Sequence, residues 1–365
     1  MRFAAFALLS LWTALASAAA ISYTNFVRPG PIQIHILRIP RHEATLEFRS
    51  LHGGAKAVGR SALTEQLKTI HGETPLAAIN GDFFQLEGAF AGDPRGLQIV
   101  DGRLVSAPAG TCSFWIGSVG EPHMAITRSA FRVTWPDGTS DPLGLNGKCD
   151  ANELELYTPD VGSTSGNAGR QIVLGAAGPD GLLRAGKDYV LQVLTIRDAQ
   201  DTPISSGTFV LALGSGIAHR ARHIRAGATL KISTTILPRV GEAICAISGG
   251  PRLVIRGKQQ RFDKAASNAY QHRSSVEKHP RSALGWSATE HFWVQVDGRS
   301  KESVGMTLNE LGALMLELGC EEAMNLDGGG SSTLWFDGKV RNRPSDGGER
   351  PIANCLVVVR KPARN

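Results

Sequence analysis

The sequence lacks several features that define common protein classes. None of its 5 cysteines forms a Cys-x-x-Cys pair, which argues against a zinc ribbon and against a thioredoxin-like site. The net charge of +6 favours anionic partners. No dense tract of lysine and arginine occurs, so we expect no nucleic-acid partner. The 365 residues, 42% of them hydrophobic and 20% charged, have an ordinary globular composition with ample core.

Long apolar runs are absent apart from a short one at the N-terminus. Arg2 supplies a positive start, residues 3–15 are mostly apolar, and the small residues Ala16-Ser17-Ala18 follow. This order is typical of a secretory signal peptide, and the apolar run is too short for a membrane anchor. We therefore expect a signal peptide over residues 1–20, no stable membrane anchor, and a secreted or periplasmic domain over residues 21–365. That compartment permits disulfides, and an odd number of cysteines leaves at least one thiol unpaired within the chain.

The turn after residue 326 combines three glycines with hydroxyl side chains. An apolar run ends in Asn325-Leu326-Asp327, then Gly328-Gly329-Gly330 and Ser331-Ser332-Thr333 lead into a second apolar run. This order predicts a strand, a tight turn and a second strand. Adjacent glycines cost backbone entropy, so three together indicate positive φ angles or a close approach to the backbone. The turn either holds a polyol or an anion beside the Asp327 carboxylate, or is the polar tip of a hairpin.

This turn does not match the common phosphate-binding or nucleophile motifs. A Walker loop needs a lysine where Ser331 stands, and a nucleophile elbow needs a glycine where Thr333 stands. A dinucleotide-binding loop opens a helix, whereas a β-rich run follows here. The sequence therefore does not predict a nucleotide site or an esterase-type nucleophile at this turn.

Two helix–strand units each deliver an asparagine and an aspartate to a loop. A helix expected over residues 61–72 precedes a strand that runs to Asn80-Gly81-Asp82. A second helix, expected over residues 307–319, precedes the strand that ends at Asn325. Ligand sites favour the ends of strands, so both loops are candidate site segments.

Between these units the chain is rich in strands and turns. Asp-Gly pairs at residues 101–102, 137–138, 297–298 and 337–338 are hairpin signals. Residues 188–197 and 208–213 have strand-like sequences, and no low-complexity linker divides the chain. We therefore predict an α+β fold: a single domain of several mostly antiparallel or mixed β-sheets with few helices.

Three further segments carry candidate side chains. Ser248-Gly249-Gly250 lies between two apolar runs, where its amides either bind an anion or a sugar oxygen or form a β-bulge. Arg281 lies in a partly apolar strand and needs a partner, which is either a carboxylate or a bound phosphate. Glu349 and Arg350 precede the last predicted strand, where a surface ion pair is the default. The two histidines of residues 219–223 have no glutamate between them, so we interpret this segment as a solvated basic surface and not as a metal site.

Together these segments resemble the phosphodiester glycosidase family, which includes the uncovering enzyme acting on N-acetylglucosamine-1-phosphodiesters and bacterial members labelled exopolysaccharide-related. The matching pieces occur in the family's order across most of residues 75–360: Asn80-Gly81-Asp82-Phe83-Phe84, Ser248-Gly249-Gly250-Pro251, Pro280-Arg281-Ser282-Ala283-Leu284-Gly285, residues 325–333, Pro344-Ser345-Asp346 and Glu349-Arg350-Pro351. The chain departs from the family at Asp82, where members often carry glycine, and it lacks the cysteine-rich modules and the anchor of the mammalian enzyme.

The resemblance implies cleavage of the glycosidic bond of a sugar-1-phosphodiester, with a sugar phosphodiester or a phosphorylated polysaccharide as the partner. Such cleavage passes through an oxocarbenium-like state that a carboxylate stabilises or attacks. We assign Asp327 as that carboxylate and Asp82 or Glu349 as the second acid/base, and we expect Arg281 to stabilise the phosphate. The other candidate binding residues are Asn80, Gly81, Ser248, Gly249, Gly250, Asn325, Gly328, Gly329, Gly330, Ser331, Ser332 and Arg350. All of these loops are expected to converge with Arg281.

Two other functions stay open. One is a non-catalytic envelope polysaccharide-binding protein on the same fold. The other is a metal-assisted phosphodiesterase in which Asp82 and Asp327 hold a divalent cation. No other cofactor is expected.

Overall fold

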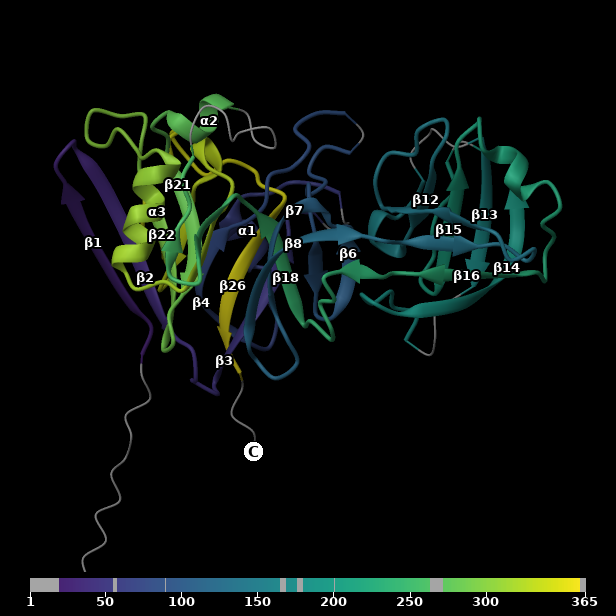
Figure 1. Ribbon diagram of the computed structural model, residues 1–365, viewed down its shortest axis with the longest axis horizontal. Helices are drawn as coiled ribbons and strands as arrows, with labels where there is room; N and C mark the ends of the chain where they lie inside the picture. Colours follow the sequence, from purple (N-terminus) through teal and green to yellow (C-terminus); the bar gives the residue numbers. More distant parts are fainter. Residues whose placement is uncertain are drawn as a thin grey trace, which may run out of the picture.

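The computed structural model describes residues 20–54, 58–88, 90–164, 169–175, 180–199, 201–262 and 272–361. The predicted signal peptide lies outside these residues, apart from Ala20. Within them the chain forms 26 strands, which belong to four sheets, and 3 α-helices. Figure 1 shows that the molecule has a larger lobe and a smaller lobe side by side.

Three sheets build the larger lobe, on the left in Figure 1. The seven-stranded sheet has the order β1 (Ser22–Arg28), β2 (Ile32–Pro40), β22 (Glu290–Val296), β21 (Arg281–Trp286), β23 (Glu322–Asn325), β19 (Arg252–Ile255), β20 (Lys258–Gln259). The five-stranded sheet has the order β25 (Lys339–Val340), β24 (Leu334–Phe336), β4 (Thr74–Asn80), β26 (Asn354–Arg360), β3 (Leu46–His52). The six-stranded sheet extends toward the smaller lobe and has the order β17 (Ile236–Leu237), β8 (Pro122–Ser129), β7 (Ala109–Ile116), β18 (Cys245–Gly249), β5 (Gln98–Val100), β6 (Arg103–Ser106).

The eight-stranded sheet forms the smaller lobe, on the right in Figure 1. Its order is β10 (Ser140–Pro142), β9 (Arg132–Thr134), β16 (Thr229–Ser233), β14 (Asp188–Arg197), β13 (Arg170–Gly175), β15 (Thr208–Leu213), β12 (Leu154–Tyr157), β11 (Gly144–Leu145). Among the described strands only β11 and β12 pair in parallel. The prediction of several mostly antiparallel sheets with few helices is confirmed, although so little helix makes the fold mostly β.

The helices are short and lie against the sheets of the larger lobe. They are α1 (Leu63–Leu67), α2 (His272–Val276) and α3 (Leu308–Glu317), and single 3₁₀ turns span Pro159–Val161, Ala218–Ala221 and Gly329–Ser331. In α3 the predicted capping box is present, because Thr307 and Glu310 each accept a hydrogen bond from the other's backbone amide. No helix within the described ranges is both long and apolar enough to cross a membrane.

Helix α1 differs from its prediction at both ends. It spans only Leu63–Leu67, so it stops well before Gly72. The expected cap, Ser61, is instead bridged to Ile352, whose amide donates to the Ser61 carbonyl at 2.9 Å. Pairing with the C-terminal segment therefore overrides the local capping preference of this serine.

Three of the four predicted Asp-Gly hairpins are present. Asp101-Gly102 joins β5 to β6, and Asp337-Gly338 joins β24 to β25, with positive φ at both residues of each pair. Residues 137–138 turn between β9 and β10. The prediction for Asp297-Gly298 is wrong, because Asp297 follows β22 and the chain continues into a loop that carries Arg299.

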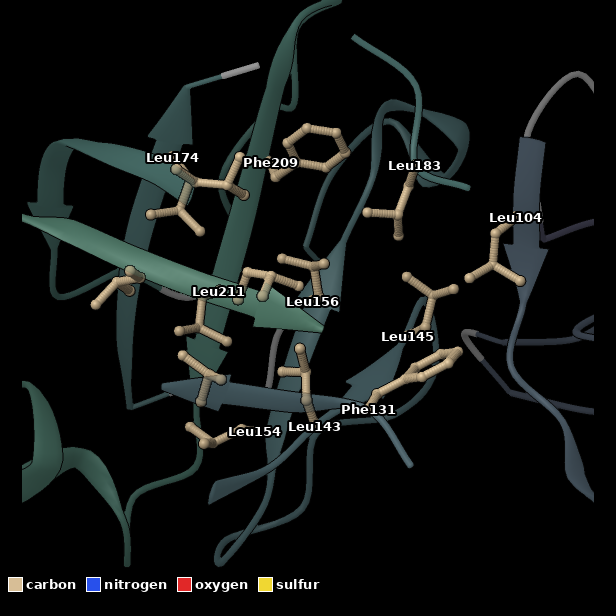
Figure 2. Packing of buried hydrophobic residues seen from close by; sticks show 14 of the residues in the cluster. Leu104, Phe131, Leu143, Leu145, Leu154, Leu156, Leu174, Leu183, Phe209 and Leu211 are labelled. Carbon is tan, nitrogen blue, oxygen red and sulfur yellow. The ribbon is translucent and has the colours of Figure 1, made fainter. Parts of the chain in front are cut away.

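Apolar packing is continuous from one lobe into the other. The largest buried cluster includes Leu104 of β6, in the larger lobe, and Leu174 and Phe209 of the smaller lobe. Figure 2 shows Leu104 facing Leu145 and Leu183, which lie between it and the rest of this cluster. Because non-polar burial is the main source of stability, this shared core couples the lobes.

All five cysteines are buried and free. Burial raises the pKa of Cys112, Cys245 and Cys320 to about 12 and that of Cys149 to about 11. None of the disulfides that an oxidising compartment permits is formed; Cys112 and Cys245 share one buried cluster, and the other three thiols lie in three other clusters.

We predict that the native protein reacts slowly with a thiol reagent such as Ellman's reagent. The buried thiols lack both access and thiolate character, so fast labelling should be near zero in native protein and should reach all 5 thiols after denaturation. Rapid labelling of two or more thiols in native protein, or a missing pair after denaturation without reductant, would contradict this arrangement.

Candidate functional site

Three loops, each from a different sheet, meet at the predicted site. The first follows β4 at Asn80, the second follows β18 at Gly249, and the third follows β23 at Asn325. The third, which we call the glycine turn, comprises residues 327–333. The expected convergence of these loops is therefore present, and hydrogen bonds hold it together.

Asn80 is the centre of these bonds. Its side chain is fully buried, its Oδ1 accepts from the Ser282 hydroxyl at 2.6 Å and from the Thr333 amide at 3.1 Å, and its Nδ2 donates to the Asp327 carbonyl at 2.8 Å. The Asp327 amide donates to the Gly81 carbonyl at 2.9 Å. Asn80 was predicted to bind substrate, but these contacts make it a positioning residue for the glycine turn.

Asn325 joins the second loop to the third. Its Nδ2 donates to the Gly250 carbonyl at 2.9 Å, and the Gly250 amide donates to the Asn325 carbonyl at 2.7 Å. A side chain on Gly249 would lie within 2.7 Å of that same carbonyl, so the strands approach too closely for any other residue. The predicted glycines here serve backbone packing.

The buried Asp82 and the half-buried Asp327 are neighbouring carboxylates. Asp82 is buried, and loss of hydration raises its pKa to about 8, helped by the nearby Asp327 charge and offset in part by the Gly96 and Phe83 amides. Loss of hydration likewise raises the pKa of Asp327 to about 6, although the Ser331 hydroxyl and the Gly328 amide favour its charged form. At neutral pH the pair therefore carries one proton, on Asp82, and one charge, on Asp327.

The glycine turn is packed beneath arginine side chains. A Cβ atom on Gly329 would lie 2.8 Å from the Arg299 guanidinium, and one on Gly330 would overlap both Arg350 and its partner Asp346. Arg350 donates to Asp346 at 2.8 Å through its Nε. These close approaches explain why the turn carries glycine.

Positive charge reaches the carboxylates from two sides. Arg350 and the exposed Arg95 both lower the pKa of Asp327, and Arg95 does the same for Asp82. Arg95 is brought there because the loop after Asp82 folds back, so that its amide donates to the Phe83 carbonyl at 2.9 Å. Arg95 and Arg299 were not predicted; only the run of Gly, Asp and Pro around Arg95 marks it as a loop in the sequence.

Several buried polar atoms at the site make no hydrogen bond of good geometry with the described residues. They are both carboxylate oxygens of Asp82, the hydroxyls of Ser331 and Ser332, and Oδ1 of Asn325. Buried polar groups are normally satisfied, so such a cluster indicates that water or a polar ligand completes it. Its donors and acceptors suit a hydroxyl-rich molecule.

Arg281 is close to the glycine turn but does not face it. A Cβ on Gly328 would lie 4.0 Å from its Cδ, whereas its guanidinium donates to the carbonyls of Met306, Ser274 and Glu277. Burial lowers its pKa to about 10, and the nearby Arg299 charge acts in the same direction. Within the described residues its guanidinium bonds backbone carbonyls and no carboxylate. Because these carbonyls hold the guanidinium away from the glycine turn, we leave Arg281 out of the phosphate-binding set.

Two other predicted side chains have structural partners. Glu349 accepts from the Thr64 amide at 3.1 Å and from its hydroxyl at 2.6 Å, so it stabilises the start of α1. The Ser248 hydroxyl is fully buried, 2.7 Å from the Ser113 hydroxyl, and donates to the Leu97 carbonyl at 3.1 Å. We therefore leave Glu349 out of the acid/base pair that we propose below.

No group of three or more histidine, cysteine, aspartate or glutamate side chains is arranged for a metal ion within the described residues. The two carboxylates that were considered for a divalent cation, Asp82 and Asp327, have no third such ligand among them. Their neighbours are hydroxyls, amides and arginines.

Comparison with known proteins gives a match to one family model over part of the chain. The family model described as phosphodiester glycosidase matches residues 195–359 and confirms the resemblance over that part, which contains Asp327 but not Asp82. A prophage-derived uncharacterized protein of Bacillus subtilis (strain 168), YomE, is 43% identical over 82 residues, which are 22% of this chain and 13% of that protein.

Two solved structures share the fold. A hypothetical protein from Synechocystis superposes with a TM-score of 0.74 at 20% identity, covering 93% of this chain and 62% of that one. A candidate exported protein of Burkholderia pseudomallei K96243 superposes with a TM-score of 0.70 at 22% identity, covering 90% of this chain and 74% of that one. The chain thus spans less than two thirds of the Synechocystis protein.

We predict that Asp82→Asn gains stability relative to the native protein as pH rises. The Asp82 pKa is about 8 in the fold and near 4 when unfolded, so the stability from its neutral form is complete below pH ~4 and is lost as pH rises toward 8. Asparagine does not titrate, so the variant's melting temperature should exceed the native one by more at pH 9 than at pH 5.

The control for this measurement is Asp137→Asn, which changes an exposed turn carboxylate whose pKa is lowered by bonds from Thr139. A pH-independent difference between native protein and Asp82→Asn would show that Asp82 is not a buried neutral acid.

Proposed function

We propose that this protein hydrolyses the glycosidic bond of a sugar-1-phosphodiester in an envelope or extracellular glycan. The observation that carries the proposal is the placement of the buried Asp82 near the half-buried Asp327, where loss of hydration raises the pKa of Asp82 to about 8 and that of Asp327 to about 6. Glycosidases need two such carboxylates, one charged and one protonated. The family match over residues 195–359 supports the reaction class.

In this proposal Asp327 faces the anomeric carbon. Its charge stabilises the oxocarbenium-like transition state or attacks it, and the Gly328 amide, which donates to its Oδ1 at 2.9 Å, fixes its orientation. Asp82 gives its proton to the bridging oxygen as the C1–O bond breaks and the oxygen keeps the electron pair. Water then supplies the hydroxyl at C1 and returns a proton to Asp82, so a free sugar and a phosphomonoester result.

The phosphate is a good leaving group and needs charge stabilisation more than strong protonation. Arg95, Arg299 and Arg350 supply it in this proposal, since they surround the glycine turn and their guanidinium groups match phosphate oxygens. The unsatisfied hydroxyls of Ser331 and Ser332 complete the site by bonding sugar hydroxyls or phosphate oxygens.

The substrate reaches the protein outside the cytoplasm in this proposal. The N-terminal sequence has the order of a signal peptide, and the structurally similar Burkholderia protein is named as a candidate exported protein. A periplasmic or secreted hydrolase that acts on a phosphorylated polysaccharide accounts for both observations.

Hydrolysis in oxygen-18 water tests the bond that is cleaved. Label in the sugar supports the glycosidase, whereas label in the phosphate would establish a phosphodiesterase, in which case a chelator should also abolish turnover. Glycan binding without turnover of any sugar phosphodiester would leave a non-catalytic polysaccharide-binding protein.

We predict that Asp327→Asn lowers kcat by about 10³-fold or more while ground-state binding changes far less, because the lost charge acts mainly in the transition state.

For the native protein, kcat/KM should fall below pH ~6 as Asp327 is protonated and above pH ~8 as Asp82 loses its proton. Steady-state kinetics and thermal unfolding on the same samples check both statements.

Asp137→Asn is again the matched control, because Asp137 bonds only its own turn. If Asp327 merely stabilised the glycine turn, its asparagine variant would lose about 1 kcal/mol of stability and kcat would stay within a few-fold. Near-normal kcat in folded Asp327→Asn would remove Asp327 from the mechanism.

A further inference from the structure

A polar groove lies close to the glycine turn. Its volume is about 400 Å³, and β1, β2, the loop after β22 (residues 297–303, with the carboxylates of Asp297 and Glu302) and residues 341–343 line it. Asn342 is in its wall, where its Nδ2 donates to the Ser332 carbonyl at 2.9 Å and its Oδ1 accepts from the Leu334 amide at 2.8 Å. Asp297 also lines the groove, and Arg299, two residues later, packs on Gly329. Asn342 therefore connects this groove to the glycine turn, which carries Asp327.

A buried hydrogen-bonded chain forms the floor of this groove. The Tyr23 hydroxyl lies 2.7 Å from Nδ1 of His35, and Nε2 of His35 lies 3.2 Å from Oδ2 of Asp297. The Arg343 amide donates to Oδ1 of Asp297 at 3.1 Å. Because each group is held by the next, the Tyr23 ring has a fixed orientation before any ligand arrives.

The Tyr23 ring is part of a flat, amphipathic surface. It stacks on Phe336 with ring centres 6.1 Å apart, and the Arg341 guanidinium lies 5.1 Å from the Tyr23 ring centre and 5.3 Å from that of Phe336. Of these three side chains, Tyr23 and Arg341 line the groove. Their flat surfaces with polar edges suit a pyranose, which has an apolar face of C–H groups and a rim of hydroxyls. The exposed amide of Asn25, on the edge strand β1, adds a donor and an acceptor beside the ring.

Arg341 also has capacity for an anion. Its contact with Asp337 is long, at 3.6 Å, and the Asp337 side chain is 81% exposed. Its Nε donates to the Phe336 carbonyl at 2.9 Å, which holds the guanidinium in place. A guanidinium fixed in this way but weakly paired matches a phosphate oxygen.

We propose that this groove binds a further sugar-phosphate unit of a polymeric substrate whose cleaved bond lies at Asp82 and Asp327. The inference rests on the proposed function only for the position of the cleaved bond, because binding in the groove is measurable without turnover. It makes the protein selective for polymers over small phosphodiesters.

The test uses two groove variants and one matched control. Asn25→Ala removes an exposed amide, and Arg341→Ala removes the guanidinium on the rings. The control, Arg38→Ala, removes an arginine of β2 that stacks 5.0 Å from the Phe292 ring centre and pairs with Glu290 at 3.4 Å, but does not line the groove. Melting temperatures report on folding, and Asn25→Ala remains informative if Arg341→Ala unfolds.

Two readouts separate this inference from the proposed function. The first is retardation in native gels that contain poly(N-acetylglucosamine-1-phosphate), with sugar-free polyphosphate as the comparison. The second is kcat/KM on that polymer and on the methyl phosphodiester of N-acetylglucosamine-1-phosphate. Both groove variants should lose about tenfold in polymer affinity and in kcat/KM on the polymer, while the small substrate changes less than about twofold and Arg38→Ala behaves as native.

Four outcomes would overturn the inference. In gels, they are that the polymer does not retard the native protein, that it retards the groove variants as strongly as the native protein, or that polyphosphate retards the native protein as strongly as the sugar polymer does. In kinetics, it is that the groove variants lose kcat/KM equally on the small and the polymeric substrate. If the polymer retards the native protein more strongly than the groove variants but neither substrate is hydrolysed, the proposed function fails while the groove assignment stands.

Discussion

The site depends on one buried amide. Asn80 offers one acceptor atom and one donor atom, and both are used to hold Ser282, Thr333 and the Asp327 backbone from two different sheets. No water is needed for these bonds, and losing the amide would leave partners unsatisfied inside the protein at about 1–3 kcal/mol each. The hydrogen bonds of Asn80 therefore set the position of the Asp327 carboxylate relative to Asp82, although both polar atoms of the Asn80 side chain are bonded within the protein.

The same burial that costs stability gives the carboxylates different roles. Asp82 has no hydrogen bond of good geometry at either oxygen and stays protonated, whereas Asp327 receives the Gly328 amide and the field of two arginines and ionises first. The buried Arg281 shows the opposite solution: backbone carbonyls satisfy it fully, so it stabilises the scaffold. The arginines that are suited to a ligand are the partly or fully exposed ones, because their charges are not already neutralised inside the fold.

The glycine turn has two faces, and both are shaped by close approach. On one face Arg299 and Arg350 pack where Gly329 and Gly330 have no side chain. On the other, Asn342 binds the backbone of the turn and forms a wall of the groove. A protein that acts on a polymer needs contacts beyond the bond that it cleaves, and Asn342 links the groove to the turn that carries Asp327.

Local sequence determined the elements whose signals are short-range. The capping box of Thr307 and Glu310, the Asp101 and Asp337 hairpins, strands β14 and β15, and the turn through Gly328–Gly330 follow from periodicity, capping and φ preferences, and they are present. The two predicted helix–strand units also placed Asp82 and Asp327 in loops at the ends of strands. Tertiary structure alone decided what each long side chain does. Ser61 pairs with Ile352 instead of capping α1, Glu349 takes over that helix start, Arg281 turns to backbone carbonyls, and Arg95 folds back to the carboxylates. A charged side chain binds whatever partner packing brings within its reach, and that partner can be as near in the chain as Glu277 is to Arg281 or as far as Thr64 is from Glu349.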